Sequence, residues 1–86
     1  MKHFADPDFW FHYRQLPESV RALADKNFEL LKRDSRHSSL RLKKIGVLYS
    51  VRIGLQYRAL ARERAEGLQW FWIGHHSAYE QLLRLQ

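Results

Sequence analysis

Two arginines stand at positions where a β-hairpin would bring them together. Arg52 and Arg58 flank a Gly-Leu-Gln segment at residues 54–56. We favour a loop of these three residues, because it keeps the apolar residues of both strands on one face. Arg52 then lies directly opposite Arg58 on the other face. A two-residue loop would shift the register and separate the arginines onto opposite faces. Because arginine stays protonated and matches phosphate oxygens with paired N–H donors, such a pair would bind an anionic backbone or stabilise charge on phosphorus. The alternative is a pair of ordinary solvent-facing arginines.

Proton transfer requires a different residue type, and two neighbouring histidines offer it. A histidine with its ordinary pKa of about 6.5 can act as an acid or a base near neutral pH. His76 is the preferred candidate, although His75 has the same chemistry and the sequence does not rank the two. The alternative is a strand-end histidine that caps the last helix or lies exposed. Tyr79 shares helical spacing with Leu82 and Leu83, so a packing or hydrogen-bonding role is an equal alternative to catalysis.

Positive charge is concentrated in the middle of the chain. Residues 32–64 hold ten Lys or Arg and two acids, a net of +8, whereas the whole chain of 86 residues has a formal net charge of +6. A basic region of this kind attracts polyanions, because neutralised phosphates release their counterions. The alternative is a solvated basic face that aids solubility. The charge distribution favours a partner that presents phosphates or acidic side chains.

Helical spacing dominates the first part of the chain. Asp6 precedes Pro7 as an N-cap precedes a first-turn proline, and aromatic residues then recur at helical spacing. Pro17 starts a second apolar stripe that runs to Leu31. These patterns predict a helical hairpin, followed by a polar loop over residues 34–39.

The period changes to two from Leu40, where Leu40 and Leu42 alternate with Arg41 and Lys43. Turns are expected at Gly46, residues 54–56 and Gly67. Short alternating segments separated by glycine-bearing turns predict an antiparallel meander. Regular alternation would place Trp70 and Trp72 on one strand face, where we expect them to belong to the core. Residues 77–80 match the Ser-x-x-Glu spacing of a capping box and predict a short C-terminal helix. The fold class is therefore α+β, with the helical hairpin on one face of the sheet.

Composition places the chain among single-domain proteins. The hydrophobic content is 45% and there is no cysteine, so we expect one packed domain over residues 1–86 without disulfides, metal or other cofactors. Asp6, Pro7, Asp8 and Arg14 interrupt the region where a secretory signal would need apolar residues. No apolar run approaches the roughly 20 residues of a membrane-spanning helix. We expect a soluble, cytoplasmic protein that does not bind membranes.

Three segments, taken in order and spacing, resemble toxins of the RelE/ParE superfamily. They read YSVRIG at 49–54, YRAL at 57–60 and WFWIGHHSAYE at 70–80. The Leu16-Pro17 entry into a helix and the approach from Ser39 to Lys44 fit the same pattern. The resemblance covers residues 9 to 83 and implies a small antiparallel sheet packed on a helical hairpin.

The resemblance also implies a function and site residues. A RelE-like toxin is held inactive by a cognate antitoxin, enters the ribosomal A site and cleaves mRNA without a metal, the 2′-hydroxyl attacking the adjacent phosphorus. Arg58 matches the family's strand arginine and Arg52 a second basic position facing it. His76 and Tyr79 fall near the C-terminal positions where members place a catalytic His or Tyr. The expected RNA contacts lie in the basic region, at Arg41, Lys43, Lys44 and Arg62.

Two further functions remain open within the same resemblance. One is a ParE-like inhibitor of gyrase without enzymatic activity, and the other is a degenerate toxin that only binds its antitoxin. Many members begin with a β-strand, whereas the aromatic segment here favours a helix, so we expect that edge strand to be absent. The strand glutamate that one branch uses as a base has no counterpart, since Glu63 lies late on its strand.

Overall fold

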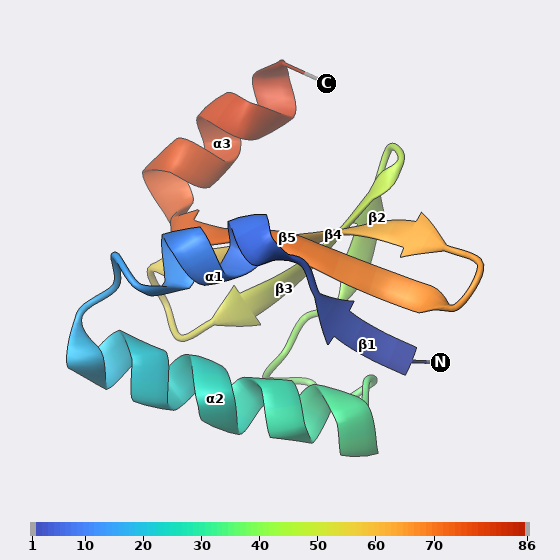
Figure 1. Cartoon of the computed structure of the whole chain (residues 1–86), viewed down its shortest axis with the longest axis horizontal. Coiled ribbons are helices and arrows are strands. Elements are labelled where there is room, and N and C mark those ends of the chain that lie inside the picture. Colours follow the sequence, from blue (N-terminus) through green and yellow to red (C-terminus); the bar gives the residue numbers. More distant parts are fainter. Residues whose placement is uncertain (1, 86) are drawn as a thin grey trace.

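The computed structural model describes residues 2–85 and consists of one mixed sheet with helices on both sides. In chain order the elements are β1 (Lys2–Ala5), α1 (Pro7–Tyr13), α2 (Glu18–Arg33), β2 (Lys43–Ile45), β3 (Leu48–Ile53), β4 (Tyr57–Arg64), β5 (Gly67–His75) and α3 (His76–Arg84). The strand order across the sheet is β1-β5-β4-β3-β2. In Figure 1, α2 and α3 lie on opposite sides of the sheet, and α1 crosses in front of β5. Within residues 2–85, no helix combines the length and the apolar character that crossing a membrane requires.

The two N-terminal helices cover one face of the sheet, as the apolar stripes predict. The side chain of Asp6 accepts a hydrogen bond from the Phe9 backbone N–H, which caps α1, and Pro7 occupies the first turn. Phe9 from α1 and Leu31 from α2 are buried in the main core. That core also contains apolar residues of the three central strands, namely Val51, Ile53, Ala59, Ala61, Leu68, Trp70 and Ile73. The α+β class and the helical hairpin are confirmed.

The loop between β3 and β4 has three residues. Ile53 pairs with Tyr57 and Arg52 pairs with Arg58, the register that keeps the apolar sets of both strands together. Gly54 has a φ of +65°, and a Cβ atom there would lie 2.8 Å from a methyl group of Leu23 on α2. The positive φ favours glycine in this turn, and an added Cβ would also displace the end of the Leu23 side chain.

A second, smaller core forms on the other side of the sheet under α3. Leu48, Leu60, Trp72 and Tyr79 are its buried members. The Ser50 hydroxyl, itself only 2% exposed, donates a hydrogen bond to the Tyr79 hydroxyl at 3.1 Å. This contact fixes α3 to the centre of β3.

An N-terminal edge strand is present, contrary to the expectation from sequence. β1 pairs with β5 in parallel, so the sheet is an antiparallel meander with one added parallel strand. Gly67, at φ +148°, makes this possible, because a Cβ atom there would lie 2.1 Å from the backbone oxygen of Lys2. The aromatic helix expected after Asp6 is also present, and the strand precedes it.

Two other local expectations are wrong. The pairing of β4 with β5 shifts between Leu60 and Ala61, which pair with Trp72 and Trp70. This β-bulge turns Trp70 into the main core and Trp72 into the smaller one, so the two indoles do not share a face. The last helix is capped by His75, whose ring Nδ1 accepts from the Ser77 backbone N–H at 3.2 Å. The expected Ser77–Glu80 capping box is not its N-cap.

Candidate functional site

The two arginines of the β3–β4 hairpin lie side by side on the sheet face opposite the helical hairpin. They are direct cross-strand partners, and their strand neighbours Val51, Ile53 and Ala59 point into the main core. Because strand side chains alternate, both guanidinium groups belong to the other face. Each side chain is partly exposed. The structure therefore produces the juxtaposition expected of Arg52 and Arg58.

Hydrogen bonds to the hairpin loop orient both guanidinium groups. Arg52 Nε donates to the Gly54 carbonyl at 3.2 Å. Arg58 Nη1 donates to the Tyr57 carbonyl at 2.7 Å and to the Leu55 carbonyl at 3.4 Å. These bonds use only part of the five N–H donors of each guanidinium, so further donors remain for a phosphate.

The backbone of Arg52 is held by a residue that the sequence reading missed. Asn27 of α2 is buried, and its Nδ2 donates to the Arg52 carbonyl at 3.2 Å. The Arg52 backbone N–H in turn donates to the Leu40 carbonyl at 2.7 Å. The sequence signal for this contact was the polar Asn27 within the apolar stripe of α2, because a buried amide needs a specific hydrogen-bond partner.

The two histidines lie at the junction of β5 and α3, next to the hairpin loop. Tyr57 pairs with His75 and Arg58 pairs with Gly74, which places His76 two residues beyond the partner of Arg58. The His76 backbone N–H donates to the Gln56 carbonyl at 2.7 Å, and the two imidazole centroids are 4.5 Å apart. His75 uses Nδ1 to cap α3, whereas no hydrogen bond of the His76 ring is found within residues 2–85. The two histidines therefore differ in their hydrogen bonds: the His75 ring caps α3, and the His76 ring remains available to a ligand.

Tyr79 lies beneath the surface of the same face. Its side chain is 8% exposed and packs with Leu48, Leu60 and Trp72. Its hydroxyl accepts the hydrogen bond from Ser50. These contacts account for a tyrosine at this position by packing and hydrogen bonding. A hydroxyl so placed reaches a ligand only if α3 moves.

The four expected RNA-contacting residues are exposed but do not all lie on one face. Lys43 pairs with Ser50 and Arg62 pairs with Leu48, so both share the face of the arginine pair. Arg62 packs its guanidinium carbon 3.7 Å from the Phe71 ring centroid. Lys44 pairs with Tyr49 on the hairpin side of the edge strand, and its ammonium lies 5.8 Å from the Tyr49 ring centroid.

Arg41 lies in the loop before β2 and has a positive φ of 48°. The structure begins β2 at Lys43, so the alternation of Leu40 and Leu42 is not that of a strand. Around this loop is an open hollow of about 590 Å³ lined by Arg36, His37, Arg41, Lys43, Lys44 and their neighbours. The basic loop and strand therefore form a continuous rim beside the face that carries Arg52 and Arg58.

None of these cations forms an ion pair with another residue of the described part of the chain. Across residues 2–85, the single ion pair joins Lys32 to Glu29 at 2.9 Å, on α2. The arginine pair and the basic rim consequently present uncompensated positive charge, which favours an anionic ligand. In the same part of the chain there is no cluster of three His, Cys, Asp or Glu side chains that could hold a metal.

The chain is similar to a known family of proteins in sequence and in fold. A family model described as the ParE-like toxin domain matches residues 18–81. No sequence among the curated proteins matches significantly.

Solved structures with the same fold include RelE of the RelB–RelE antitoxin–toxin complex from Methanococcus jannaschii, with 18% identity, a TM-score of 0.68 and coverage of 92% of this chain and 96% of that one. The isolated RelE toxin of E. coli is 16% identical, with a TM-score of 0.61 and coverage of 98% and 97%. The YoeB/ParE toxin of Agrobacterium tumefaciens is 16% identical, with a TM-score of 0.65 and coverage of 88% and 99%.

Proposed function

Because the chain belongs to the ParE-like toxin domain family of the RelE/ParE superfamily, we propose that it is the toxin of a toxin–antitoxin pair and cleaves mRNA on the ribosome. The reaction is a metal-independent transesterification in the cytoplasm. The observation that carries the proposal is the pairing of Arg52 with Arg58 on a sheet face where neither has a carboxylate partner among residues 2–85. Fold alone does not fix the chemistry in such families, so the nuclease activity depends on the residues of this site.

The proposed reaction needs three contributions. A base takes the proton of the ribose 2′-hydroxyl, whose oxygen attacks the adjacent phosphorus. Positive charge stabilises the phosphorane, and an acid protonates the 5′-oxygen as its bond to phosphorus breaks. The products are a 2′,3′-cyclic phosphate and a 5′-hydroxyl.

The residues divide these contributions by their chemistry. Arg52 and Arg58 stabilise charge, because a guanidinium does not give up its proton near neutral pH. His76 serves as the acid or base, a choice supported by the engagement of His75 in the cap of α3. Lys43 and Arg62 bind the RNA backbone on the face of the arginine pair, and Arg41 and Lys44 bind it along the β2 edge. Tyr79 contributes directly to the reaction only if α3 shifts. With α3 in its present position, the hydrogen bond between Ser50 and Tyr79 supports β3.

The second part of the proposal is a cognate antitoxin as partner. Structures with the same fold include RelB–RelE complexes from M. jannaschii and E. coli, which supports a protein partner for this chain. An acidic segment would neutralise the basic face, and an amphipathic segment would cover apolar side chains on the helical hairpin.

Expression of the chain without its partner tests the nuclease proposal. The expected result is growth arrest, with mRNA cuts that appear only where ribosomes translate. Arg58→Ala should abolish both, because it removes half of the charge that stabilises the phosphorane. Arg64→Ala is the matched control, since Arg64 is exposed at the far end of β4 and donates to the Gln69 side chain.

Two outcomes would replace the nuclease by another function. DNA breaks without RNA cleavage would select a ParE-like gyrase inhibitor, a reading to which the ParE-like family match lends weight. Harmless overexpression together with tight antitoxin binding would select a degenerate toxin that only binds its partner.

A further inference from the structure

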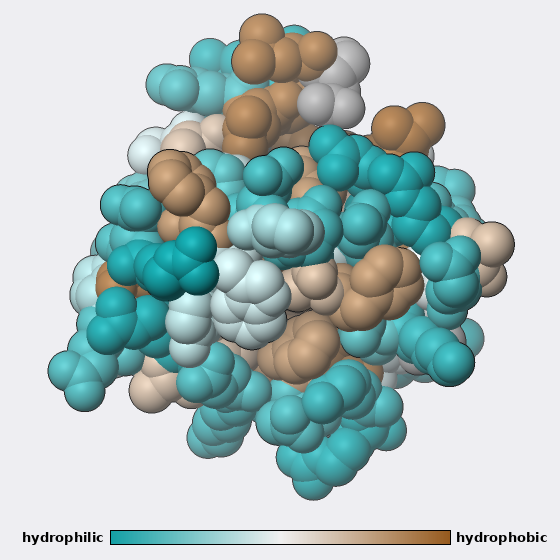
Figure 2. Space-filling model, in the orientation of Figure 1, coloured by the Kyte–Doolittle hydropathy of each residue, from teal (hydrophilic) through white to brown (hydrophobic). Residues whose placement is uncertain are grey.

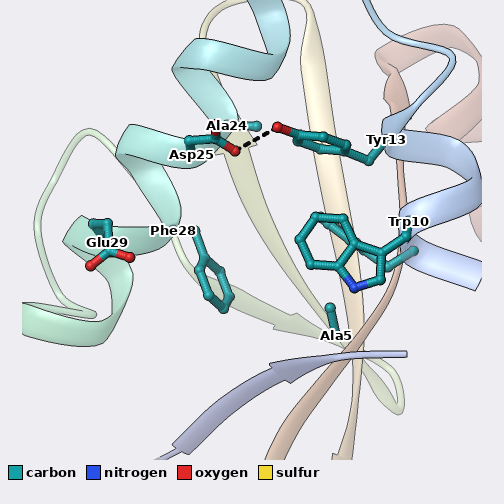
Figure 3. Close-up of a pocket in the computed structure, with 8 residues that line it drawn as sticks. Ala5, Trp10, Tyr13, Ala24, Asp25, Phe28 and Glu29 are labelled. Carbon is teal, nitrogen blue, oxygen red and sulfur yellow. Dashed lines mark hydrogen bonds between the residues drawn. The ribbon is translucent and has the colours of Figure 1, made fainter. Parts of the chain in front are cut away.

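An aromatic cavity lies between α1 and α2, on the opposite side of the sheet from the arginine pair. It has a volume of about 240 Å³ and is lined by Ala5, Phe9, Trp10, Tyr13, Ala24, Asp25, Phe28 and Glu29. Figure 3 shows Trp10 and Phe28 on opposite sides of it, with Asp25 and Tyr13 along a third side. The space-filling view shows pale and apolar side chains gathered between the helices and bordered by hydrophilic ones (Figure 2).

The aromatic wall on the α1 side is a packed cluster. Trp10 makes edge contacts with Phe9 and Tyr13, each with ring centroids 5.2 Å apart. Yet Trp10 is 43% exposed, which is unusual for so large an apolar side chain. Exposed tryptophan beside a cavity is characteristic of protein-binding surfaces, where such rings form the anchoring contacts.

Asp25 adds negative charge to the aromatic wall. Its Oδ1 accepts a hydrogen bond of 2.8 Å from the Tyr13 hydroxyl. Asp25 forms no ion pair with any residue from 2 to 85. Arg21, one turn earlier on α2, lies near enough for its charge to act on the Tyr13 hydroxyl, but it forms no ion pair with Asp25. A carboxylate that a tyrosine holds in place and that has no ion-pair partner is complementary to a positively charged group in the cavity.

The rim of the cavity already contains the contacts that such a group would make. The Lys32 ammonium lies 5.0 Å from the Phe28 ring centroid and pairs with Glu29 at 2.9 Å. A cation is thus bound by an aromatic face and a carboxylate at the outer end of the cavity. Trp10 and Asp25 offer the same two kinds of group, an aromatic face and a carboxylate, in a cavity whose lining includes no Lys or Arg.

We propose that this cavity binds an arginine side chain presented by a partner polypeptide. A guanidinium is flat and weakly hydrated, so it can lie against the Trp10 and Phe28 rings and donate to Asp25. The exposure of Trp10 at the mouth favours a polypeptide over a free small molecule. The site is independent of the proposed nuclease chemistry, because its residues lie on the other face of the sheet.

An NMR titration of the 15N-labelled protein with N-acetyl-arginine amide tests this site. The indole N–H resonance of Trp10 should shift with a Kd on the order of 1 mM, a value ordinary for a ligand of this size. Trp70 and Trp72 are internal references, because they are 1% and 8% exposed and do not line this cavity. N-acetyl-citrulline amide has the same shape without the charge and should bind at least about 5-fold more weakly.

Substitutions identify the carboxylate that matters. Asp25→Asn should weaken binding of the arginine amide about 5-fold or more, whereas Glu18→Gln, an exposed change in the first turn of the same helix, should leave it within about 2-fold. Equal binding of citrulline and arginine amides would overturn the proposal in favour of a purely apolar pocket. Binding of spermidine as tight as that of the arginine amide would overturn the choice of a guanidinium.

Discussion

Substitutions of Ser50 and Tyr79, on the α3 side of the sheet, can distinguish a structural role of Tyr79 from a catalytic one. Ser50 and Tyr79 are both buried, and their hydroxyls form one hydrogen bond. Removal of one partner leaves a buried polar group unpaired, whereas removal of both does not. Substitutions at these two positions therefore report on stability in a pattern that a catalytic role would not produce.

The Tyr79→Phe substitution should lower the free energy of unfolding by about 1–2 kcal/mol, because the Ser50 hydroxyl loses its partner. The double variant Tyr79→Phe/Ser50→Ala should cost clearly less than the sum of the two single changes. Urea unfolding of all four proteins measures this coupling. Additive effects would show that the bond contributes nothing.

At Arg52 and Arg58, unlike at Tyr79, we expect a substitution to abolish activity without lowering the stability of the fold. Like charges paired directly across two strands are destabilising by up to about 1 kcal/mol. Arg58→Gln should therefore leave the free energy of unfolding unchanged or raise it by up to this amount at low salt, while activity is lost. The gain should shrink in about 1 M salt, where the screening length falls to about 3 Å. A large loss of stability in urea unfolding would mean that the arginine serves the fold.

Secondary-structure elements show which features the sequence could predict and why. The hairpin register followed from Gly54 and the alternation around it, because only a three-residue loop keeps both apolar sets on one face. β1 was missed because a four-residue strand at the N-terminus has too few residues to establish a period. The bulge in β5 was missed because inserting one residue reverses the alternation without changing composition.

The pairing of the two arginines in the candidate site was predictable from the sequence, but the contacts of Asn27 and Tyr79 were not. Strand alternation brought Arg52 and Arg58 together, because both lie near one turn. The roles of Asn27 and Tyr79 depend on tertiary contacts with the Arg52 carbonyl and Ser50, and no local pattern specifies these partners. The cap that His75 forms with Ser77 is a local contact.

Attachment of β1 to the sheet should depend on pH through His3. The Trp70 indole N–H donates to His3 Nδ1 at 3.2 Å, and burial lowers the pKa of His3 below its ordinary value. Since the unfolded chain binds a proton near pH 6.5 and the folded one only at lower pH, this contribution is complete above about pH 6.5 and is lost as the pH falls through the folded pKa.

Urea unfolding between pH 7.5 and pH 5 provides the measurement. His3→Gln should lose less stability over this range than the native chain, because glutamine also accepts the Trp70 hydrogen bond and does not titrate. Curves that run parallel for both proteins would exclude His3 as the titrating group.

Charge is distributed unevenly over the molecule. Arg41, Lys43, Lys44 and Arg62 lie along the β2 edge or on the face of the arginine pair, whereas Asp25 and Glu29 line the aromatic cavity on the other side. RNA binding by such a surface is governed by counterion release and weakens with added salt.

Binding of a single-stranded RNA should accordingly weaken with salt in proportion to the phosphates that the basic rim contacts. Each contact contributes about −0.7 to the slope of log K against log salt concentration. Lys43→Gln/Lys44→Gln should reduce the steepness of this slope by about 1.4 if both contact phosphates. Lys2→Gln, on the opposite edge strand, should leave it unchanged. Fluorescence anisotropy at several salt concentrations measures the slopes, and equal effects of the two variants would show that binding is not localised.

The chemistry of the cut ends shows whether the chain cleaves mRNA by attack of the 2′-hydroxyl on the adjacent phosphorus. In a reconstituted translation reaction with purified ribosomes and a defined mRNA, the native chain should generate fragments ending in a 2′,3′-cyclic phosphate and beginning with a 5′-hydroxyl. Arg52→Ala and Arg58→Ala should each reduce the cleavage rate by about 100-fold or more, as loss of a charge-stabilising group does. An intact message, or cleavage that persists in both variants, would contradict the account.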